Sequence, residues 1–117
     1  GLSFWLPRLV GPARARGLAM LGEPLSARRA ADWGLIWEAV PDDAFAERVE
    51  ARARALADGP TAGLRLTRDA LREGLENDWG AHLEREAELQ AEAGTTRDFL
   101  TAAVAAAEGG TPVFEGR

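Results

Sequence analysis

One short segment of this sequence has the pattern of a β-strand, and the rest of the sequence offers it no evident partner. Residues 35–40 read LIWEAV, a run of apolar, β-branched and aromatic side chains that ends at Pro41. A strand alone leaves its backbone N–H and C=O groups unpaired, and even an isolated strand pair is marginal in water. The other candidate is a stub at residues 112–114. We therefore predict one strand, at about 35–40, whose neighbours belong to polypeptide outside these residues.

The opening of the sequence points the same way. It reads GLSFWLPRLVG, with Leu2, Phe4, Trp5 and Leu6 among its first six residues. Chain termini are normally frayed and polar, because nothing ties them down. We expect Gly1 to be an interior position of a longer fold.

Composition excludes several classes of function. A net charge of −5 argues against non-specific binding to nucleic acid. No apolar run approaches the ~20 residues of a membrane span, so we expect no membrane partner and a cytoplasmic location. The chain has no cysteine, which excludes disulfides and thiolate chemistry, and one histidine, His82, which cannot form a multi-histidine metal site.

Most of the remaining sequence has helical spacing. Ser26 is a favourable N-cap and Gly34 a favourable stop for a short helix. Glu50 and Arg54 are spaced for an i,i+4 ion pair. Further helices are expected over about 12–21, from Pro41 to Gly59, from Thr61 to about Leu75, over roughly 80–93, and from Thr95 or Thr96 to Glu108.

Four runs, GLSFWLPRLVG, EPLSARRAADWGLIWEAVP, GPTAGLRLTRDAL and TPVFEGR, follow one another in this sequence. In order and spacing they resemble the second half of the crotonase (enoyl-CoA hydratase/isomerase) superfamily. The start, Leu2-Ser3-Phe4, is most similar to the branch that isomerises ring-1,2-epoxyphenylacetyl-CoA. The resemblance implies an α/β fold, the C-terminal part of a ββα spiral. Residues 1–58 would be the last turn of the spiral core and residues 60–117 a helical region that assembles trimers or hexamers.

The resemblance also implies a chemistry. Family members bind an acyl-CoA, hold its thioester carbonyl in an oxyanion hole of two backbone N–H groups, and move protons with one or two carboxylates. By this alignment the catalytic residues lie upstream of Gly1, and none lies in this chain. Coenzyme A is part of the substrate, so no further cofactor is expected. The chain alone is predicted to be inactive. Its expected partner is the N-terminal half of the same fold.

Three residues are candidates for binding substrate. Leu2, Phe4 and Trp5 follow the expected catalytic position, and aromatic walls suit an aromatic acyl group. Packing in a core is the alternative interpretation of Phe4 and Trp5, and core positions are expected for Trp33 and Trp37. Arg8 could form a structural ion pair or reach a phosphate, and we favour the structural role.

Other conspicuous residues have simpler interpretations. The acidic residues of the 80–93 segment are expected to face solvent, Asp42 and Asp43 to begin a helix, and His82 to lie at the surface or in packing. Relatives often carry an aromatic and a basic residue near the C-terminus that reach coenzyme A. Here these positions are Ala106 and Gly109 or Gly110, whose side chains can neither stack on adenine nor pair with a phosphate.

Two functions therefore remain open. The chain is either the C-terminal part of an acyl-CoA hydratase or isomerase, or a non-catalytic helical module that oligomerises or binds a partner. The first predicts an uncovered strand edge and apolar terminus, whereas the second predicts an autonomous folded domain.

Overall fold

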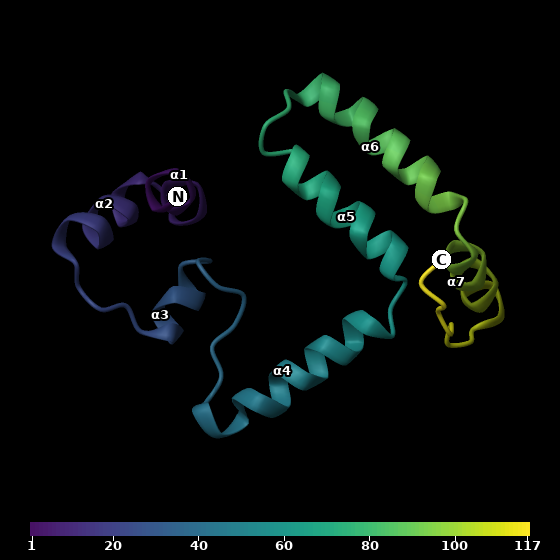
Figure 1. Cartoon of the computed structure of the whole chain (residues 1–117), viewed down its shortest axis with the longest axis horizontal. Helices are drawn as coiled ribbons and strands as arrows, with labels where there is room; N and C mark the ends of the chain where they lie inside the picture. The colour runs from purple at the N-terminus through teal and green to yellow at the C-terminus, as the bar shows by residue number, and fades with distance from the viewer. The chain divides into compact units, whose positions relative to one another are not determined.

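The computed structural model describes residues 1–117 and contains seven α-helices. The predominance of helix is confirmed. The chain contacts define two compact units, residues 1–46 and 47–117, which are described separately. The helices are α1 Leu2–Val10, α2 Pro12–Leu21, α3 Ala27–Asp32, α4 Asp42–Ala57, α5 Thr61–Glu73, α6 Trp79–Gly94 and α7 Arg97–Glu108 (Figure 1).

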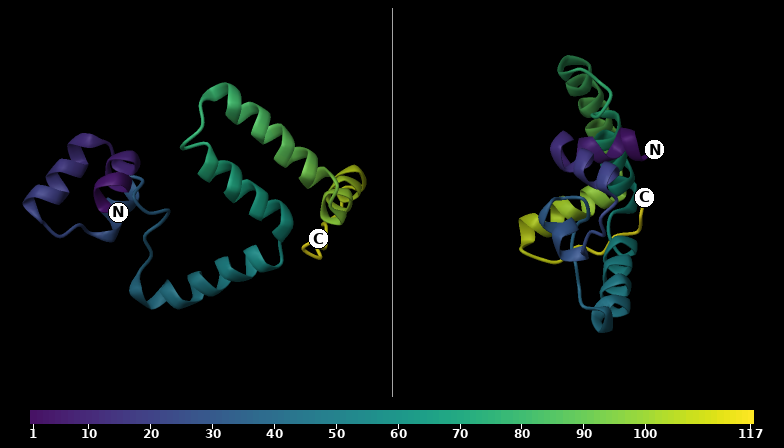
Figure 2. Two further views of the ribbon diagram at one scale, coloured as in Figure 1. Left: turned by 45° about the horizontal axis from the view of Figure 1, so that its top comes forward. Right: turned by 90° about the vertical axis from the view of Figure 1, so that its left-hand side faces the viewer.

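The predicted strand at residues 35–40 is wrong, and the stub at 112–114 is not a strand either. Both views of Figure 2 draw the segment between α3 and α4 as coil. The reason lies in how α3 ends. Gly34 adopts φ +74° and donates to the carbonyl of Ala31, while the Leu35 N–H donates to the carbonyl of Ala30 at 2.9 Å. This is a Schellman motif. The Leu35 N–H, which a strand would offer to a neighbouring strand, therefore pairs with a carbonyl of the last turn of α3 instead.

The core of the first unit lies between α1 and α2. Leu6, Val10 and Ala15 are buried together, and Leu18, Trp33 and Leu35 pack against them. Gly11, at φ +79°, makes the turn between the two helices. The predicted cap of α3 is confirmed, because the Arg29 N–H donates to the Ser26 hydroxyl oxygen at 3.3 Å. Trp37 is 87% exposed, so its expected core position is wrong.

The second unit contains two neighbouring antiparallel helices, α5 and α6 (Figure 1). Their contact buries Leu66 and Leu89, which are 3% and 4% exposed. The Asp78 carboxylate caps α6 by accepting from the Ala81 N–H at 3.0 Å. Helix α7 packs against α6 and begins at the predicted cap, Thr96.

Helix α4 has no buried residue. Its apolar stripe is present, but Phe45, Val49 and Leu56 are each at least half exposed. The predicted Glu50–Arg54 ion pair is confirmed at 2.7 Å. Ion pairs on an exposed helix contribute little to stability.

The chain leaves much apolar surface open. Twenty large apolar side chains are at least 36% exposed, whereas only six apolar residues are buried. Scattered apolar side chains are normal on a protein surface, but contiguous patches usually mark interaction sites. None of the seven helices combines the length and the hydropathy that a membrane span requires.

Candidate functional site

The candidate substrate-binding residues lie at the surface of α1. Leu2, Phe4 and Trp5 are 62%, 46% and 47% exposed, so the two rings do not pack in the core of this chain. Phe4 and Trp5 meet edge to face, with ring centroids 5.0 Å apart. The buried face of α1 is formed by Leu6 and Val10 instead.

A cleft of about 300 Å³ lies between α1 and α2. Leu2, Ser3, Leu6 and Pro7 form one wall, and residues of α2 from Pro12 to Met20 form the other. Phe4 and Trp5 are not among its lining residues. The structure therefore places Leu2 at the cleft and leaves the aromatic pair beside it. An apolar cleft with few polar groups is typical of a small-molecule site.

Arg8 makes structural contacts within α1, although not the expected ion pair. Its Nη1 donates to the carbonyl oxygen of Phe4 at 2.8 Å, and its guanidinium carbon lies 3.6 Å from the centre of the Phe4 ring. A cation over an aromatic face is attracted by the ring quadrupole. Arg8 thus fixes the orientation of Phe4.

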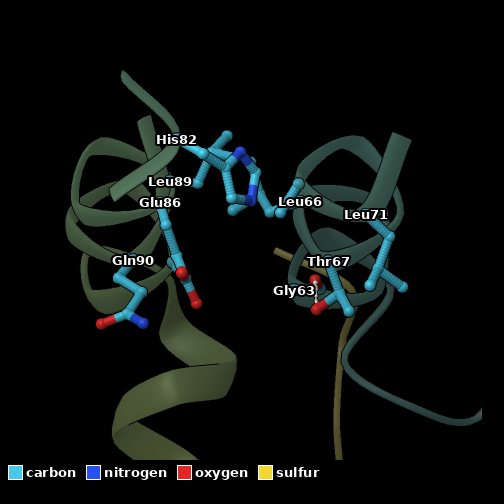
Figure 3. Close-up of a pocket in the computed structure, with 10 residues that line it drawn as sticks. Gly63, Leu66, Thr67, Leu71, His82, Glu86, Leu89 and Gln90 are labelled. Carbon is cyan, nitrogen blue, oxygen red and sulfur yellow. Dashed lines mark hydrogen bonds between the residues drawn. The ribbon is translucent and has the colours of Figure 1, made fainter. Parts of the chain in front are cut away.

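A second cavity, of about 250 Å³, lies between α5 and α6 (Figure 3). Leu66 and Leu89 form its apolar part, and Thr67, Glu86 and Gln90 contribute polar atoms. The Thr67 hydroxyl donates to the Gly63 carbonyl at 3.0 Å, within its own helix.

His82 projects from α6 towards Leu66 on α5 (Figure 3). The ring is half-buried, and its Nδ1 is buried without a hydrogen-bond partner. A Cβ added at Gly74 would lie 2.9 Å from His82 Nε2. The packing interpretation of His82 is confirmed, and Gly74 leaves the space that the ring occupies.

We predict that Gly74→Ala displaces the His82 ring, because the new methyl group would overlap Nε2. The ¹H–¹³C NMR signals of the imidazole should shift, and α5–α6 stability should fall by about 1–2 kcal/mol. Gly94→Ala is the control, since nothing lies within 4 Å of a Cβ built there. Unchanged imidazole signals in Gly74→Ala would show that this packing is wrong.

The acidic residues of α6 face solvent, as expected. Glu88 accepts from Arg85 at 3.0 Å, and Glu92 accepts from Arg65 at 2.7 Å. No group of three or more metal-ligating side chains is found. These carboxylates serve as partners of arginines on α5 and α6.

Arg85 also connects α6 to α5. Its Nε donates to Glu73 Oε2 at 2.7 Å. This hydrogen bond, followed by the charge of the guanidinium, holds the pKa of Glu73 below its ordinary value of 4.5. The lowered pKa means that the pair stabilises the fold above pH 4.5 and that this contribution disappears as the pH falls through the folded-state pKa.

We predict that Glu73→Gln removes this acid-dependent part of the stability. Unfolding free energies of wild type and variant should differ at pH 7 and converge once the pH falls below the lowered folded-state pKa of Glu73, where Glu73 is protonated in both states. Glu76→Gln, three residues on, is the control. A gap between wild type and Glu73→Gln that is constant with pH would contradict the ion-pair assignment.

The C-terminal segment is held by a residue that the sequence did not single out. Asp98, in the first turn of α7, is 2% exposed. Its carboxylate accepts from the backbone N–H of Glu115 at 2.8 Å and of Gly116 at 2.9 Å. The Asp98 N–H donates in turn to the Arg117 carbonyl at 3.0 Å. Gly116 adopts φ +78°, and a Cβ there would lie 2.5 Å from the Thr61 hydroxyl oxygen.

The positions where relatives were expected to contact coenzyme A end a helix here. Ala106 is exposed on α7. Gly109 adopts φ +69°, and Gly110 donates to the Ala105 carbonyl at 2.8 Å. Both glycines therefore serve the C-terminal cap.

Comparison with known proteins identifies the family. The model of the enoyl-CoA hydratase/isomerase family matches residues 1–117. The chain belongs to this family. The crotonase resemblance of the sequence is therefore confirmed.

Family members align with the chain from end to end. It is 46% identical to a Rhodobacter capsulatus protein named "probable enoyl-CoA hydratase", over 100% of this chain and 46% of that protein. It is 38% identical to the 1,2-epoxyphenylacetyl-CoA isomerase of Escherichia coli, over 100% of this chain and 45% of the isomerase. A crystal structure of an enoyl-CoA hydratase/isomerase from Cupriavidus metallidurans superposes with a TM-score of 0.90 at 32% identity, over 99% of this chain and 44% of that one. The chain spans about half the length of the relatives that it matches.

Proposed function

We propose that the chain is the C-terminal part of an acyl-CoA hydratase or isomerase. The observation that carries the proposal is the alignment itself: all 117 residues match, yet they correspond to only 46% and 45% of the two relatives. The exposed apolar surfaces of α1, α2 and α4 fit a chain that packs against further polypeptide.

In this proposal the reacting groups come from polypeptide that precedes Gly1. Two backbone N–H groups there stabilise the enolate oxygen of the thioester, and carboxylates there move the protons. This chain contributes a wall of the acyl pocket through Leu2, Phe4 and Trp5. Coenzyme A arrives as part of the substrate, and no other cofactor is required.

The substrate class follows from the relatives and from α1. A ring-1,2-epoxyphenylacetyl-CoA is one candidate, because the E. coli relative is named for it and an exposed Phe4–Trp5 pair suits an aryl group. A 2-enoyl-CoA is the other, because the R. capsulatus relative is named a hydratase. Residues 60–117 form the proposed contact between subunits of a trimer or hexamer.

The experiment compares the chain with a fusion protein that joins the N-terminal part of the R. capsulatus relative to this chain. Both are assayed with crotonyl-CoA for hydration and with 1,2-epoxyphenylacetyl-CoA for isomerisation. We expect turnover from the fusion protein and none from the chain alone. Turnover by the purified 117-residue chain would refute the placement of the catalytic groups.

The non-catalytic module remains the second candidate. The observation that favours it is the self-contained fastening of the second unit, in which Asp98 holds the C-terminal segment without help from another chain. Under this alternative the fusion protein is as inactive as the chain alone, and the chain folds by itself.

A further inference from the structure

Two arginines of the first unit contact one tryptophan ring. The guanidinium carbon of Arg14, from α2, lies 5.0 Å from the centre of the Trp33 ring, and that of Arg29, from α3, lies 4.8 Å from it. Arg29 is four residues before Trp33, so the helical turn brings those two together. Arg14 reaches the ring from the neighbouring helix.

The Trp33 indole that both guanidinium groups contact is held in place by packing. Trp33 is half-buried and packs against the core formed by Leu6, Val10 and Ala15. The ring keeps both guanidinium carbons within 5.0 Å of its centre, whereas free arginine side chains would separate because like charges repel. The arrangement is built into the fold of the unit.

Neither guanidinium has a carboxylate partner. Arginines of the second unit behave differently: Arg65, Arg85 and Arg97 pair with carboxylates at 2.7, 2.7 and 3.3 Å. The charge balance agrees, because residues 1–33 contain five arginines and two acidic residues in a chain whose net charge is −5. The N–H donors of Arg14 and Arg29 are thus left for an anion from outside.

We propose that Arg14, Trp33 and Arg29 form a binding site for the phosphate groups of a phosphorylated ligand. A guanidinium presents its donors as a planar fork that matches two phosphate oxygens, and a diphosphate has enough oxygens to engage two forks. The ring keeps both forks in place, so little entropy is lost when the anion binds.

The assignment of this site to coenzyme A rests on the proposed function, because it gives that function a specific contact with the substrate. Coenzyme A carries a diphosphate and a further phosphate on its ribose, and so it belongs to the ligand class. Inorganic pyrophosphate carries the same diphosphate group without the nucleotide. Binding of pyrophosphate does not require turnover, so the site and the proposed enzyme activity can fail independently.

The test follows the indole N–H signal of Trp33 by ¹H–¹⁵N NMR while pyrophosphate is added to the chain and to the fusion protein. Trp33→Phe assigns this signal among the four indoles. We expect a saturable shift, and a dissociation constant about tenfold weaker in the double variant Arg14→Gln/Arg29→Gln, since charge-assisted hydrogen bonds are lost.

The matched control is Arg16→Gln/Arg28→Gln, which removes the same charge from the same two helices. It should bind pyrophosphate within about twofold of wild type, since the shared forks remain. Circular dichroism verifies equal helix content in all variants. The proposal is overturned if neither protein shows a saturable shift, or if both double variants weaken binding equally. Coenzyme A is the second ligand: tighter binding than pyrophosphate assigns the site to the nucleotide, and equal binding assigns it to phosphate alone.

Discussion

Replacing Asp98 with alanine should release the C-terminal segment and lower the free energy of unfolding of the fusion protein by about 3 kcal/mol or more. The buried carboxylate accepts two backbone hydrogen bonds, from Glu115 and Gly116, and a hydrogen bond to a charged group contributes roughly 1.5–3 kcal/mol. Alanine leaves both donors unsatisfied. Chemical denaturation measures the loss, and hydrogen exchange at these two amides should accelerate.

Two variants sharpen this prediction. Asp43→Ala removes an exposed acidic residue from the first turn of α4, the same helical position, and should cost less than about 1 kcal/mol. Asp98→Asn retains one acceptor oxygen and should fall between wild type and alanine. If Asp98→Ala and Asp43→Ala cost the same, Asp98 is an ordinary helix-start residue and does not fasten the C-terminal segment.

Leu66→Ala is expected to have the second large effect. Leu66 is 3% exposed and lies on the apolar side of the α5–α6 cavity with Leu89 (Figure 3). Truncating a buried leucine costs about 2–5 kcal/mol, because apolar contacts are lost and the neighbours only partly relax. Few other apolar residues of the second unit are buried, so little can compensate.

Leu66→Met is the matched control, because it keeps the volume and should cost less than about 1.5 kcal/mol. The measurement is denaturant unfolding of the fusion protein with both variants. A loss below about 1 kcal/mol in Leu66→Ala would mean that α5 and α6 are not held together by this contact.

Helix ends were predictable because their signals are local. The Ser26 cap, the Thr96 cap and the Gly34 stop each depend on residues within one turn of the helix. The strand prediction for residues 35–40 was wrong because a strand depends on a neighbouring strand, and the nearby sequence provides none. Their apolar pattern was real, but within this chain the backbone N–H groups of Leu35 and Ile36 donate to Ala30 at the end of α3.

Contact of Leu2, Phe4 and Trp5 with a substrate stays a prediction. Leu2 was singled out by its place in the sequence, and it lines the α1–α2 cleft. Asp98 was missed because its partners lie 17 and 18 residues away in a segment that has no regular pattern. The approach of Arg14 and Arg29 to the Trp33 ring was equally hidden, since it depends on where the fold places α2 relative to Trp33.

We propose that this chain completes its fold against further polypeptide of the family. Thermal melting followed by circular dichroism at 222 nm tests it most directly, with the 117-residue chain and the fusion protein side by side. We expect a sharp cooperative transition from the fusion protein and a broad, non-cooperative loss of helix from the chain alone. A cooperative transition of the chain by itself, at the temperature of the fusion protein, would contradict the claim and favour an autonomous helical module.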